Sequence, residues 1–284
     1  RRAAPASLIL AGRLAPRLGQ PVIAETKAGS QGIVGLEAVR NSPPDGYTFV
    51  YANVSNISIN PHVHLKLPYD GLRDFAPVTQ IGLSVLAMVV PAGLGPKTLP
   101  EFIAYTKANP GKVSFASFGT GSTSHIYGEM LKGSAGIEMT HVPYKATPPA
   151  MNDLLGGTIQ VLFGDTTSTL PFIRQGTVRA LAVTTAKRSK AAPDVPAMAE
   201  TVPGYESASW QMLVAPGTTP PEVIALLNRE VHTIFSDPAT IQELERRGVG
   251  PALTGNPAEV RDFVKKEIVR WSDVVRRAGL EGSQ

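Results

Sequence analysis

The spacing of apolar and polar residues predicts short helices and strands that alternate along most of the chain. Leucines recur at a helical interval at Leu10, Leu14 and Leu18, which predicts a helix over residues 6–18 that ends before Gly19. Such alternation is typical of an α/β fold whose strands are mostly parallel. The elements expected next are a strand at 21–24, a helix at 35–40 and a buried strand at 47–52.

A second block of alternating elements follows a strand pair within residues 78–90. Thr98 and Glu101 have the spacing of a capping box, with Pro100 just inside the helix that runs to about Asn109. The remaining elements expected here are strands at 113–116, 141–144, 159–163 and 180–184 and helices at 124–132, 150–155 and 167–175.

The last part of the chain predicts a strand at 210–214 and then three helices that each begin at a proline, over 220–235, 238–247 and 257–278. Two α/β blocks with a helical tail predict two lobes. We expect one lobe from residues 1–91 and 210–284 and the other from residues 92–209. The segments 86–91 and 211–216 would form a two-strand hinge, and proteins of this kind bind ligands in the cleft between lobes.

Composition narrows the classes of function. The chain has no cysteine among its 284 residues, which excludes zinc–thiolate sites, cysteine nucleophiles and disulfides. Aromatic residues make up only 6%, too few for a base-stacking nucleic-acid surface, so we expect no nucleic-acid partner. The net charge of +4 is compatible with an anionic ligand. No apolar run reaches 18 residues, and residues 1–20 do not form a signal peptide, so we expect a cytosolic chain or a mature form without its leader.

The sharpest local feature is a loop of glycines and hydroxyl residues between a predicted strand and a predicted helix. Its glycines allow the backbone to approach a ligand, and its hydroxyls and helix N-terminal amides can all donate hydrogen bonds. Such a loop favours a bound carboxylate or phosphate, although an ordinary capped turn would look the same in sequence. The candidate ligand-binding residues here are Ser117, Gly119, Gly121, Ser122, Thr123 and Ser124.

Three further polar loops follow predicted strands, at the end of the strand where open α/β sheets bind ligands. One is the glycine loop 29–35, one contains Asn53, Ser55 and Asn56, and one contains Asp165 followed by Thr166, Thr167 and Ser168. Asn53, Ser55, Asn56 and Asp165 are therefore candidate ligand-binding residues as well. Because these loops are richer in neutral donors than in Lys or Arg, they suit a small carboxylate.

Enzyme, cofactor and metal functions find less support in these residues. Ser122, His125 and Asp165 hold the atoms of a hydrolase triad, but no Gly-x-Ser-x-Gly elbow is present. Neither glycine loop carries a full dinucleotide fingerprint or a Walker lysine, and we expect no cofactor. His62 and His64 lack an acidic partner, so we expect no metal site.

Many segments in order along residues 5–279 resemble the tripartite tricarboxylate transporter receptors, also called Bug or TctC proteins. The segments that carry the resemblance are Leu18-Gly19-Gln20-Pro21-Val22, Ala28-Gly29-Ser30-Gln31-Gly32, Pro44-Asp45-Gly46-Tyr47-Thr48, Leu67-Pro68-Tyr69-Asp70, Asp74-Phe75-Ala76-Pro77-Val78, Asn109-Pro110-Gly111, Val142-Pro143-Tyr144-Lys145, Asp153-Leu154-Leu155-Gly156-Gly157, Leu181-Ala182-Val183-Thr184 and Pro193-Asp194-Val195-Pro196.

The resemblance implies a periplasmic, monomeric solute-binding receptor with two α/β lobes and a Venus-flytrap cleft, and no enzyme. The implied ligands are small carboxylates: dicarboxylates, tricarboxylates, acidic amino acids or aromatic acids. The implied partners are the membrane components of a tripartite importer or, as an alternative, a sensor kinase that reads the closed form. A Ser/His hydrolase is a third alternative. The resemblance also places the loops at Ser117–Ser124, Asn53–Asn56 and Asp165 around the ligand.

Three departures from the family pattern bear on the ligand. The family's first strand and its Gly-Gly-x-x-Asp loop precede the first helix, so we expect that strand and part of one binding loop to be missing or altered, with Ala4 where the family has Asp. Ala146 stands where the family's Val-Pro-Tyr-Lys-Gly motif ends in glycine, and Ser30 where alanine is common.

Overall fold

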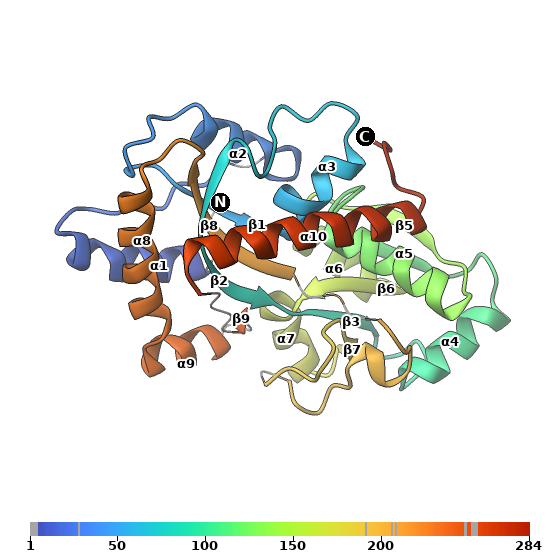
Figure 1. The fold of residues 1–284 in the computed structure, drawn as a ribbon. Helices are drawn as coiled ribbons and strands as arrows, with labels where there is room; N and C mark the ends of the chain where they lie inside the picture. The colour runs from blue at the N-terminus through green and yellow to red at the C-terminus, as the bar shows by residue number, and fades with distance from the viewer. Residues whose placement is uncertain are drawn as a thin grey trace. The chain divides into compact units, whose positions relative to one another are not determined.

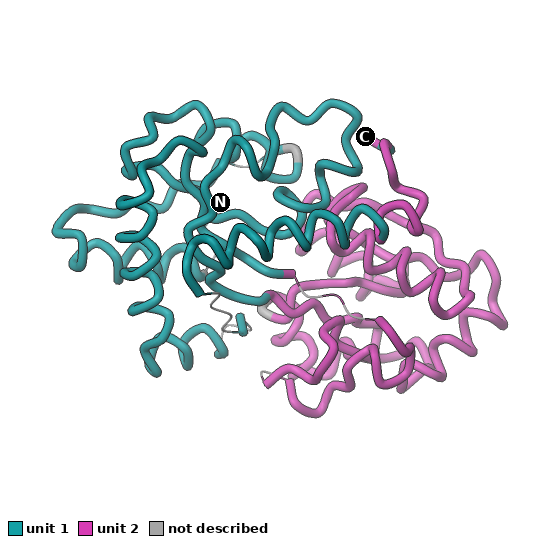
Figure 2. The backbone as a smooth tube through the Cα atoms, in the orientation of Figure 1, with its two compact units in different colours: residues 1–83, 210–273, 283 teal, residues 84–209, 274–282, 284 magenta. Residues whose placement is uncertain are grey.

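The computed structural model describes residues 5–27, 29–190, 192–205, 207, 209–246, 249–250 and 255–284, so Ala4 lies outside the described residues. The chain divides into two compact units (Figure 2). Unit 1 comprises Arg1–Leu83, Trp210–Asp273 and Ser283, and unit 2 comprises Ser84–Ser209, Val274–Gly282 and Gln284. The lobe boundaries expected from the sequence, at 91/92 and 209/210, stay a proposal.

The elements of unit 1 combine a sheet with helices from both ends of the chain (Figure 1). Its sheet has the strand order β1-β8-β2-β9, and β1 runs antiparallel to β8, with Val50 opposite Val214. The elements are α1 (Pro5–Leu18), α2 (Ile33–Arg40), β1 (Val50–Asn53), a π-helical turn (Ser55–Ile59), α3 (Asn60–Val63), β2 (Phe75–Ser84), β8 (Ser209–Pro216), α8 (Pro221–Phe235), α9 (Pro238–Arg246), β9 (Val249–Gly250) and α10 (Pro257–Arg277).

The core of unit 1 lies between α1, α8 and the sheet. Leu10 and Leu14 of α1 are buried in one cluster with Leu213 of β8 and Leu227 and Val231 of α8. The leucine spacing of the first helix therefore predicts its buried face correctly.

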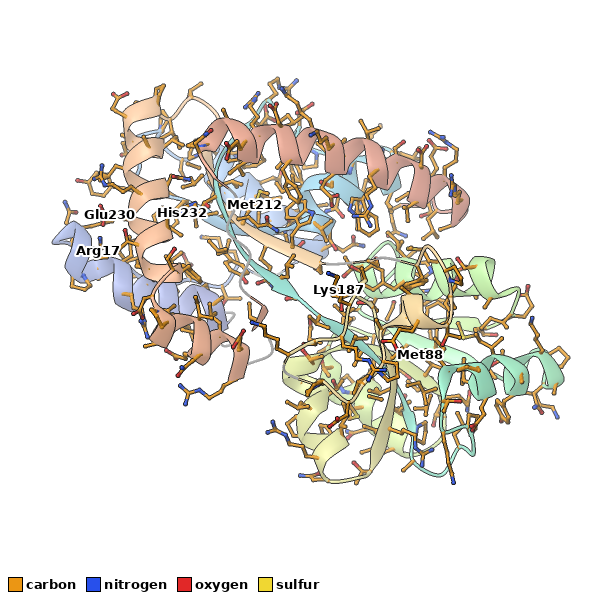
Figure 3. The ribbon with its side chains drawn as sticks, turned by 60° about the horizontal axis from the view of Figure 1, so that its bottom comes forward. Arg17, Met88, Lys187, Met212, Glu230 and His232 are labelled. Atoms are coloured by element: carbon orange, nitrogen blue, oxygen red, sulfur yellow. The ribbon has the colours of Figure 1, made fainter. Side chains whose placement is uncertain are left out.

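An ion pair flanks this core. Arg17 Nε on α1 donates to Glu230 Oε2 on α8 at 2.7 Å, and Figure 3 shows the two side chains beside each other. The guanidinium of Arg17 is the main cause that lowers the pKa of Glu230.

The strand expected at residues 21–24 does not form. These residues have no regular secondary structure, and the side chain of Ile23 is 87% exposed. A strand needs a neighbour for its backbone groups, and Pro21 has no N–H to offer. Only Val22 of this segment packs partly against the core, so the apolar run is a loop in this structure.

Unit 2 holds a five-stranded sheet in the order β5-β4-β6-β3-β7. Its elements are β3 (Leu86–Pro91), α4 (Leu99–Ala108), β4 (Ser114–Ser117), α5 (Thr123–Ala135), β5 (Thr140–Pro143), α6 (Thr147–Leu155), β6 (Val161–Asp165), α7 (Thr166–Arg174) and β7 (Val178–Val183). The expected parallel arrangement holds for β4 with β5 and for β4 with β6. β3 lies between β6 and β7 in the sheet and runs antiparallel to both.

Helix starts in both units agree with the capping signals. Thr98 Oγ1 accepts from the amide of Glu101 at 3.3 Å at the start of α4. At α10 the capping box is complete, since Asn256 Oδ1 accepts from the amide of Glu259 at 3.1 Å and Glu259 Oε2 accepts from the amide of Asn256 at 3.1 Å.

Both tryptophans are packing residues in unit 1. Trp210 on β8 and Trp271 on α10 are almost fully buried, and both indole N–H groups donate to Glu267 Oε2 on α10, at 2.6 and 3.0 Å. This shared acceptor joins α10 to the sheet of unit 1.

Candidate functional site: polar loops after the strands

The loop from Ser117 to Ser124 joins β4 to α5 in unit 2. β4 ends at Ser117, and Ser122 is the N-cap of α5, with its Oγ accepting from the amide of His125 at 3.3 Å. Gly119 and Gly121 both adopt positive φ angles, of 113° and 77°. Only glycine adopts such angles without strain, so the loop's course depends on these two residues.

Most hydroxyls of this loop bind the loop itself. Ser117 Oγ donates to the carbonyl of Gly119 at 3.1 Å, and Ser122 Oγ donates to the same carbonyl at 2.7 Å. Ser124 Oγ accepts from the amide of Phe118 at 3.0 Å. These hydrogen bonds give the three serines a structural role in shaping the loop.

The groups that the loop leaves for a ligand are the first amides of α5. The N–H groups of Thr123 and Ser124 lie in the first helical turn and have no intrahelical acceptor. Thr123 is half-buried. The positive end of the helix dipole adds to the attraction that these amides exert on an anion.

Asp165 lies at the same edge of the sheet as this loop. β4 and β6 are parallel neighbours, so Ser117 and Asp165 each end a strand at the carboxyl edge of one sheet. The Ser168 and Thr169 hydroxyls donate to the Asp165 main-chain carbonyl at 3.0 and 3.1 Å. Burial raises the pKa of the Asp165 carboxyl above its ordinary value.

The candidate residues of unit 1 form a compact turn after β1. Asn53 Oδ1 accepts from the amide of Asn56 at 3.2 Å, and Asn56 Oδ1 accepts from the amide of Asn53 at 2.9 Å. Asn56 is 5% exposed, and its amide nitrogen lies 2.8 Å from where a Cβ on Gly32 would stand. The glycine loop before α2 and the Asn53–Asn56 turn are thus in contact, and Ser55 opens the π-helical turn between them and α3.

Two histidines form hydrogen bonds with the loop of unit 2 that the sequence did not predict. His125 accepts from the amide of Gly121 at its Nδ1, at 3.0 Å, and His141 Nε2 lies 2.5 Å from Ser117 Oγ. The roles predicted for them from the sequence were a hydrolase base for His125 and a strand position for His141. A histidine within the first helical turn after a glycine pair was the available signal for His125.

The alternatives of a triad and a metal site gain no support from the geometry. The Ser122 hydroxyl is engaged with Gly119, and His125 uses Nδ1 to accept from the backbone. His62 Nε2 is 2.9 Å from the carbonyl of Ile268. Among the described residues no three His, Asp or Glu side chains gather closely enough to hold a metal ion.

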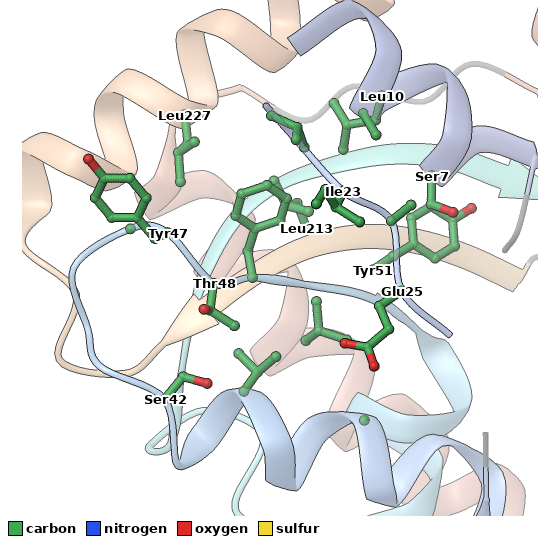
Figure 4. Close-up of a pocket in the computed structure, with 18 of the residues that line it drawn as sticks. Ser7, Leu10, Ile23, Glu25, Ser42, Tyr47, Thr48, Tyr51, Leu213 and Leu227 are labelled. Atoms are coloured by element: carbon green, nitrogen blue, oxygen red, sulfur yellow. The ribbon is translucent and has the colours of Figure 1, made fainter. Parts of the chain in front are cut away.

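A cavity of about 870 Å³ lies within unit 1 (Figure 4), and Gly32 and Gly35 of the glycine loop are part of its lining. The segment 20–27 and residues 48–51 line it, together with apolar side chains that include Leu10, Leu213 and Leu227. Glu25 adds a carboxylate to the lining. Polar and charged residues, including Thr26, Lys27 and Asp45, complete a mixed lining.

Within the described part of the chain, no helix has both the length and the apolar content that crossing a bilayer requires.

Comparison with known proteins shows which family the chain is similar to. The family model described as "Tripartite tricarboxylate transporter family receptor", TctC, matches residues 8–280. BugT of Bordetella pertussis is 35% identical over 275 residues, which cover 96% of this chain and 84% of BugT. Among solved structures, the R. palustris protein Rpa4515 with adipate is similar, with 32% identity, a TM-score of 0.90 and coverage of 96% of this chain and 92% of that one.

MatC from Rhodopseudomonas palustris, solved with bound malate, has 27% identity and a TM-score of 0.83, with coverage of 97% of this chain and 96% of MatC. These similarities show an α/β periplasmic-binding-protein fold and a family of binding proteins, not of enzymes. The chain belongs to the TctC family of tripartite tricarboxylate transporter receptors.

Proposed function

We propose that this receptor captures a small dicarboxylate in the periplasm and delivers it to the membrane components of a tripartite importer. The observation that carries the proposal is the pair of similar receptors solved with adipate and with malate, both of which are short aliphatic dicarboxylates. The family's role as a transporter receptor favours an importer over a sensor kinase as partner, and we propose that the receptor acts as a monomer.

The proposed ligand groups are the polar loops that follow β1, β4 and β6. In unit 2 they are the loop Ser117–Ser124 and Asp165, and in unit 1 they are Asn53, Ser55 and Asn56. The amides of Thr123 and Ser124 provide donors without a full positive charge, which suits a ligand that must later be released. The cavity of unit 1 is not part of the proposed site.

A thermal-shift experiment tests the proposal. Purified receptor is heated with adipate, malate, citrate, glutamate, benzoate or inorganic phosphate, and native mass spectrometry of the fresh protein reports any ligand retained from the cell. We expect adipate or malate to raise the melting temperature and phosphate to leave it unchanged. No shift with any carboxylate, together with a protein free of retained ligand, would overturn the proposal.

A matched pair of variants locates the site. Ser122→Ala with Thr123→Ala removes the N-cap of α5 and a loop hydroxyl, whereas Thr98→Ala removes the N-cap of α4, a helix of the same unit. Each loses a cap worth about 1 kcal/mol, so both variants should melt at a lower temperature. Only the loop variant should lose the ligand-induced shift. Equal shifts in the two variants would contradict the assignment of the loop.

A further inference from the structure

Two imidazole rings lie in contact beside the Ser117–Gly121 turn of unit 2. His125 comes from the first turn of α5 and His141 from β5, and their ring centroids are 3.6 Å apart with an angle of 16° between the planes. Phe115 of β4 packs on both rings, at 6.1 and 5.1 Å between centroids. His125 is only 4% exposed and His141 is half-buried, so the His125 ring belongs to the interior of the unit.

Each ring holds a different end of the turn. The amide of Gly121 donates to His125 Nδ1 at 3.0 Å. His141 Nε2 is 2.5 Å from Ser117 Oγ, so a hydrogen bond joins the two atoms, and the tautomer of His141 sets which of them donates. The two rings together fix the backbone on both sides of Gly119.

This arrangement requires His125 to be neutral and in one tautomer. Because Nδ1 accepts a hydrogen bond, its proton must be on Nε2. Nε2 faces Glu129 Oε1 at 3.7 Å, and Glu129 is held by Lys132 at 2.8 Å. Burial, the neighbouring His141 and the Lys132 ammonium lower the pKa of His125 to about 3. Burial and Lys132 lower the pKa of His141 to about 4.

The turn needs such an anchor because of its glycines. Gly119 and Gly121 both have positive φ, and glycine has access to more backbone conformations than any other residue. Gly121 immediately precedes the N-cap Ser122, so its orientation sets that of the first turn of α5. An acceptor on the amide of Gly121 thus restricts the amides of Thr123 and Ser124 that point out of the helix.

We propose that His125 and His141 are positioning residues for ligand binding, which preorganise the Ser117–Ser124 loop through the Gly121 amide and the Ser117 hydroxyl. The proposal rests on the proposed function, since the loop is the part of the site that it serves. In this proposal neither histidine contacts the ligand. Their contribution to affinity comes from the ordering of the loop before the ligand arrives.

The test uses the different reach of asparagine and glutamine. The Asn side-chain oxygen can occupy the place of a histidine Nδ1, and the Gln amide can reach the place of Nε2. His125→Asn should keep the acceptor for Gly121 and His125→Gln should lose it, whereas His141→Gln should keep the hydrogen bond to Ser117 and His141→Asn should lose it. All four variants lose the ring stacking, so the comparison within each pair isolates the hydrogen bond.

Adipate and malate affinity is measured by calorimetry for the four variants and the wild-type receptor. We expect His125→Gln and His141→Asn to bind about tenfold more weakly than His125→Asn and His141→Gln, the result of a less ordered loop. Equal affinities within each pair would overturn the proposal and leave the histidines as packing residues only.

A second readout needs no ligand. Amide hydrogen exchange of Gly121, followed by NMR, should be slow in the wild type and in His125→Asn and fast in His125→Gln. Long-range proton–nitrogen spectra should show the His125 proton on Nε2. Exchange that is equally slow in both variants would contradict the anchoring of Gly121. If neither dicarboxylate binds the wild type while the exchange pattern holds, the proposed function fails and the anchoring of the loop stands.

Discussion

His125 and His141 are separated by 16° in ring plane and 3.6 Å in centroid distance, so the two imidazoles form a parallel stack inside unit 2. Such a stack is favourable only while both rings are neutral, because a positive charge on either imidazole is costly away from water. The pKa values of about 3 for His125 and about 4 for His141 express that cost.

We predict that the receptor loses stability between about pH 6.5 and pH 4 because of this pair. Both histidines titrate in the folded state below the ordinary value of 6.5, so the unfolded chain takes up their protons first as the pH falls. Their contribution is fully present above pH 6.5 and is lost progressively toward pH 4 and pH 3. Each histidine can contribute at most about 1.4 kcal/mol per pH unit to the free energy of unfolding.

Urea unfolding at pH 7, 6, 5 and 4.5 measures this slope. The double variant His125→Asn, His141→Gln has no imidazole at either position and should show a shallower fall over the same range. Carboxylates with lowered pKa values, such as Glu200 at about 2, contribute in both proteins and cancel in the comparison. Parallel curves for the two proteins would refute the prediction.

Two glycines of α5 should respond to alanine in opposite directions. A Cβ on Gly128 would lie 2.2 Å from Phe115 Cε2, whereas a Cβ on Gly133 would meet nothing within 4 Å. Phe115 packs against the histidine pair and cannot yield easily. We expect Gly128→Ala to lower the free energy of unfolding by about 1–3 kcal/mol. Gly133→Ala should raise it by up to about 1 kcal/mol, since alanine favours the helix.

Chemical denaturation of the two variants checks this pair. Because they make the same substitution in the same helix, any difference comes from the surroundings of the added methyl group. A Gly128→Ala protein as stable as the wild type would show that Phe115 can move, and that the packing around the histidine pair is looser than described.

Elements with local signals could be predicted from the sequence, and those that depend on distant partners could not. Leucine spacing predicts helix α1, and capping pairs such as Asn256 and Glu259 predict the starts of α4 and α10. The expected strand at 21–24 fails because nothing nearby in the sequence tells whether a neighbouring strand will pair with it. The antiparallel direction of β3 likewise follows from its pairing with β6, about 75 residues later in the chain.

Some features of the candidate site can likewise be predicted from local sequence, and others depend on distant residues. Its place after β4 is readable from the glycines and the N-cap Ser122, which are local features. The inward direction of the serine hydroxyls cannot be predicted from the sequence, because Ser117 contacts His141, which lies 24 residues away in the chain. The neighbouring position of Asp165 depends on the parallel pairing of β4 with β6.

Asp165→Asn should stabilise the receptor at pH 7. Burial raises the pKa of Asp165, so as the pH rises above the ordinary value of 3.8 the unfolded chain loses this proton before the folded state does. The charged carboxyl therefore costs stability at neutral pH, and an amide of the same shape removes the cost. We expect a higher melting temperature at pH 7 and little difference at pH 4. A lower melting temperature at pH 7 would mean that the carboxylate has a favourable partner.

The same variant reports on the proposed ligand. As a ligand group for a dicarboxylate, the Asp165 carboxyl must be protonated so that it can donate a hydrogen bond, whereas an amide can donate at every pH. We expect Asp165→Asn to bind adipate at least as tightly as the wild type at pH 7, and with a weaker dependence on pH. Calorimetry at pH 5, 6 and 7 measures both affinities. A large loss of affinity in the variant would mean that the carboxyl of Asp165 does not act as a donor to the ligand.

Glu267 should be the most sensitive single carboxylate of unit 1. Its Oε2 accepts from the indoles of Trp210 and Trp271, at 2.6 and 3.0 Å, and its Oε1 accepts from Arg270 at 3.2 Å. Glu267→Ala leaves two buried N–H donors without an acceptor and should lower the free energy of unfolding by about 2–5 kcal/mol. Glu267→Gln keeps an oxygen acceptor and should lose less.

The chain contains only two tryptophans, and both donate to Glu267, so tryptophan emission during urea unfolding reports directly on this contact. Glu281→Gln is the matched control, because Glu281 is exposed and lies 4.0 Å from Arg276. Exposed pairs of this kind contribute about 0–1 kcal/mol, so the control should unfold almost as the wild type does. If Glu267→Ala were no less stable than Glu281→Gln, the indoles would have to find other acceptors, and the attachment of α10 to the sheet of unit 1 would rest on apolar packing alone.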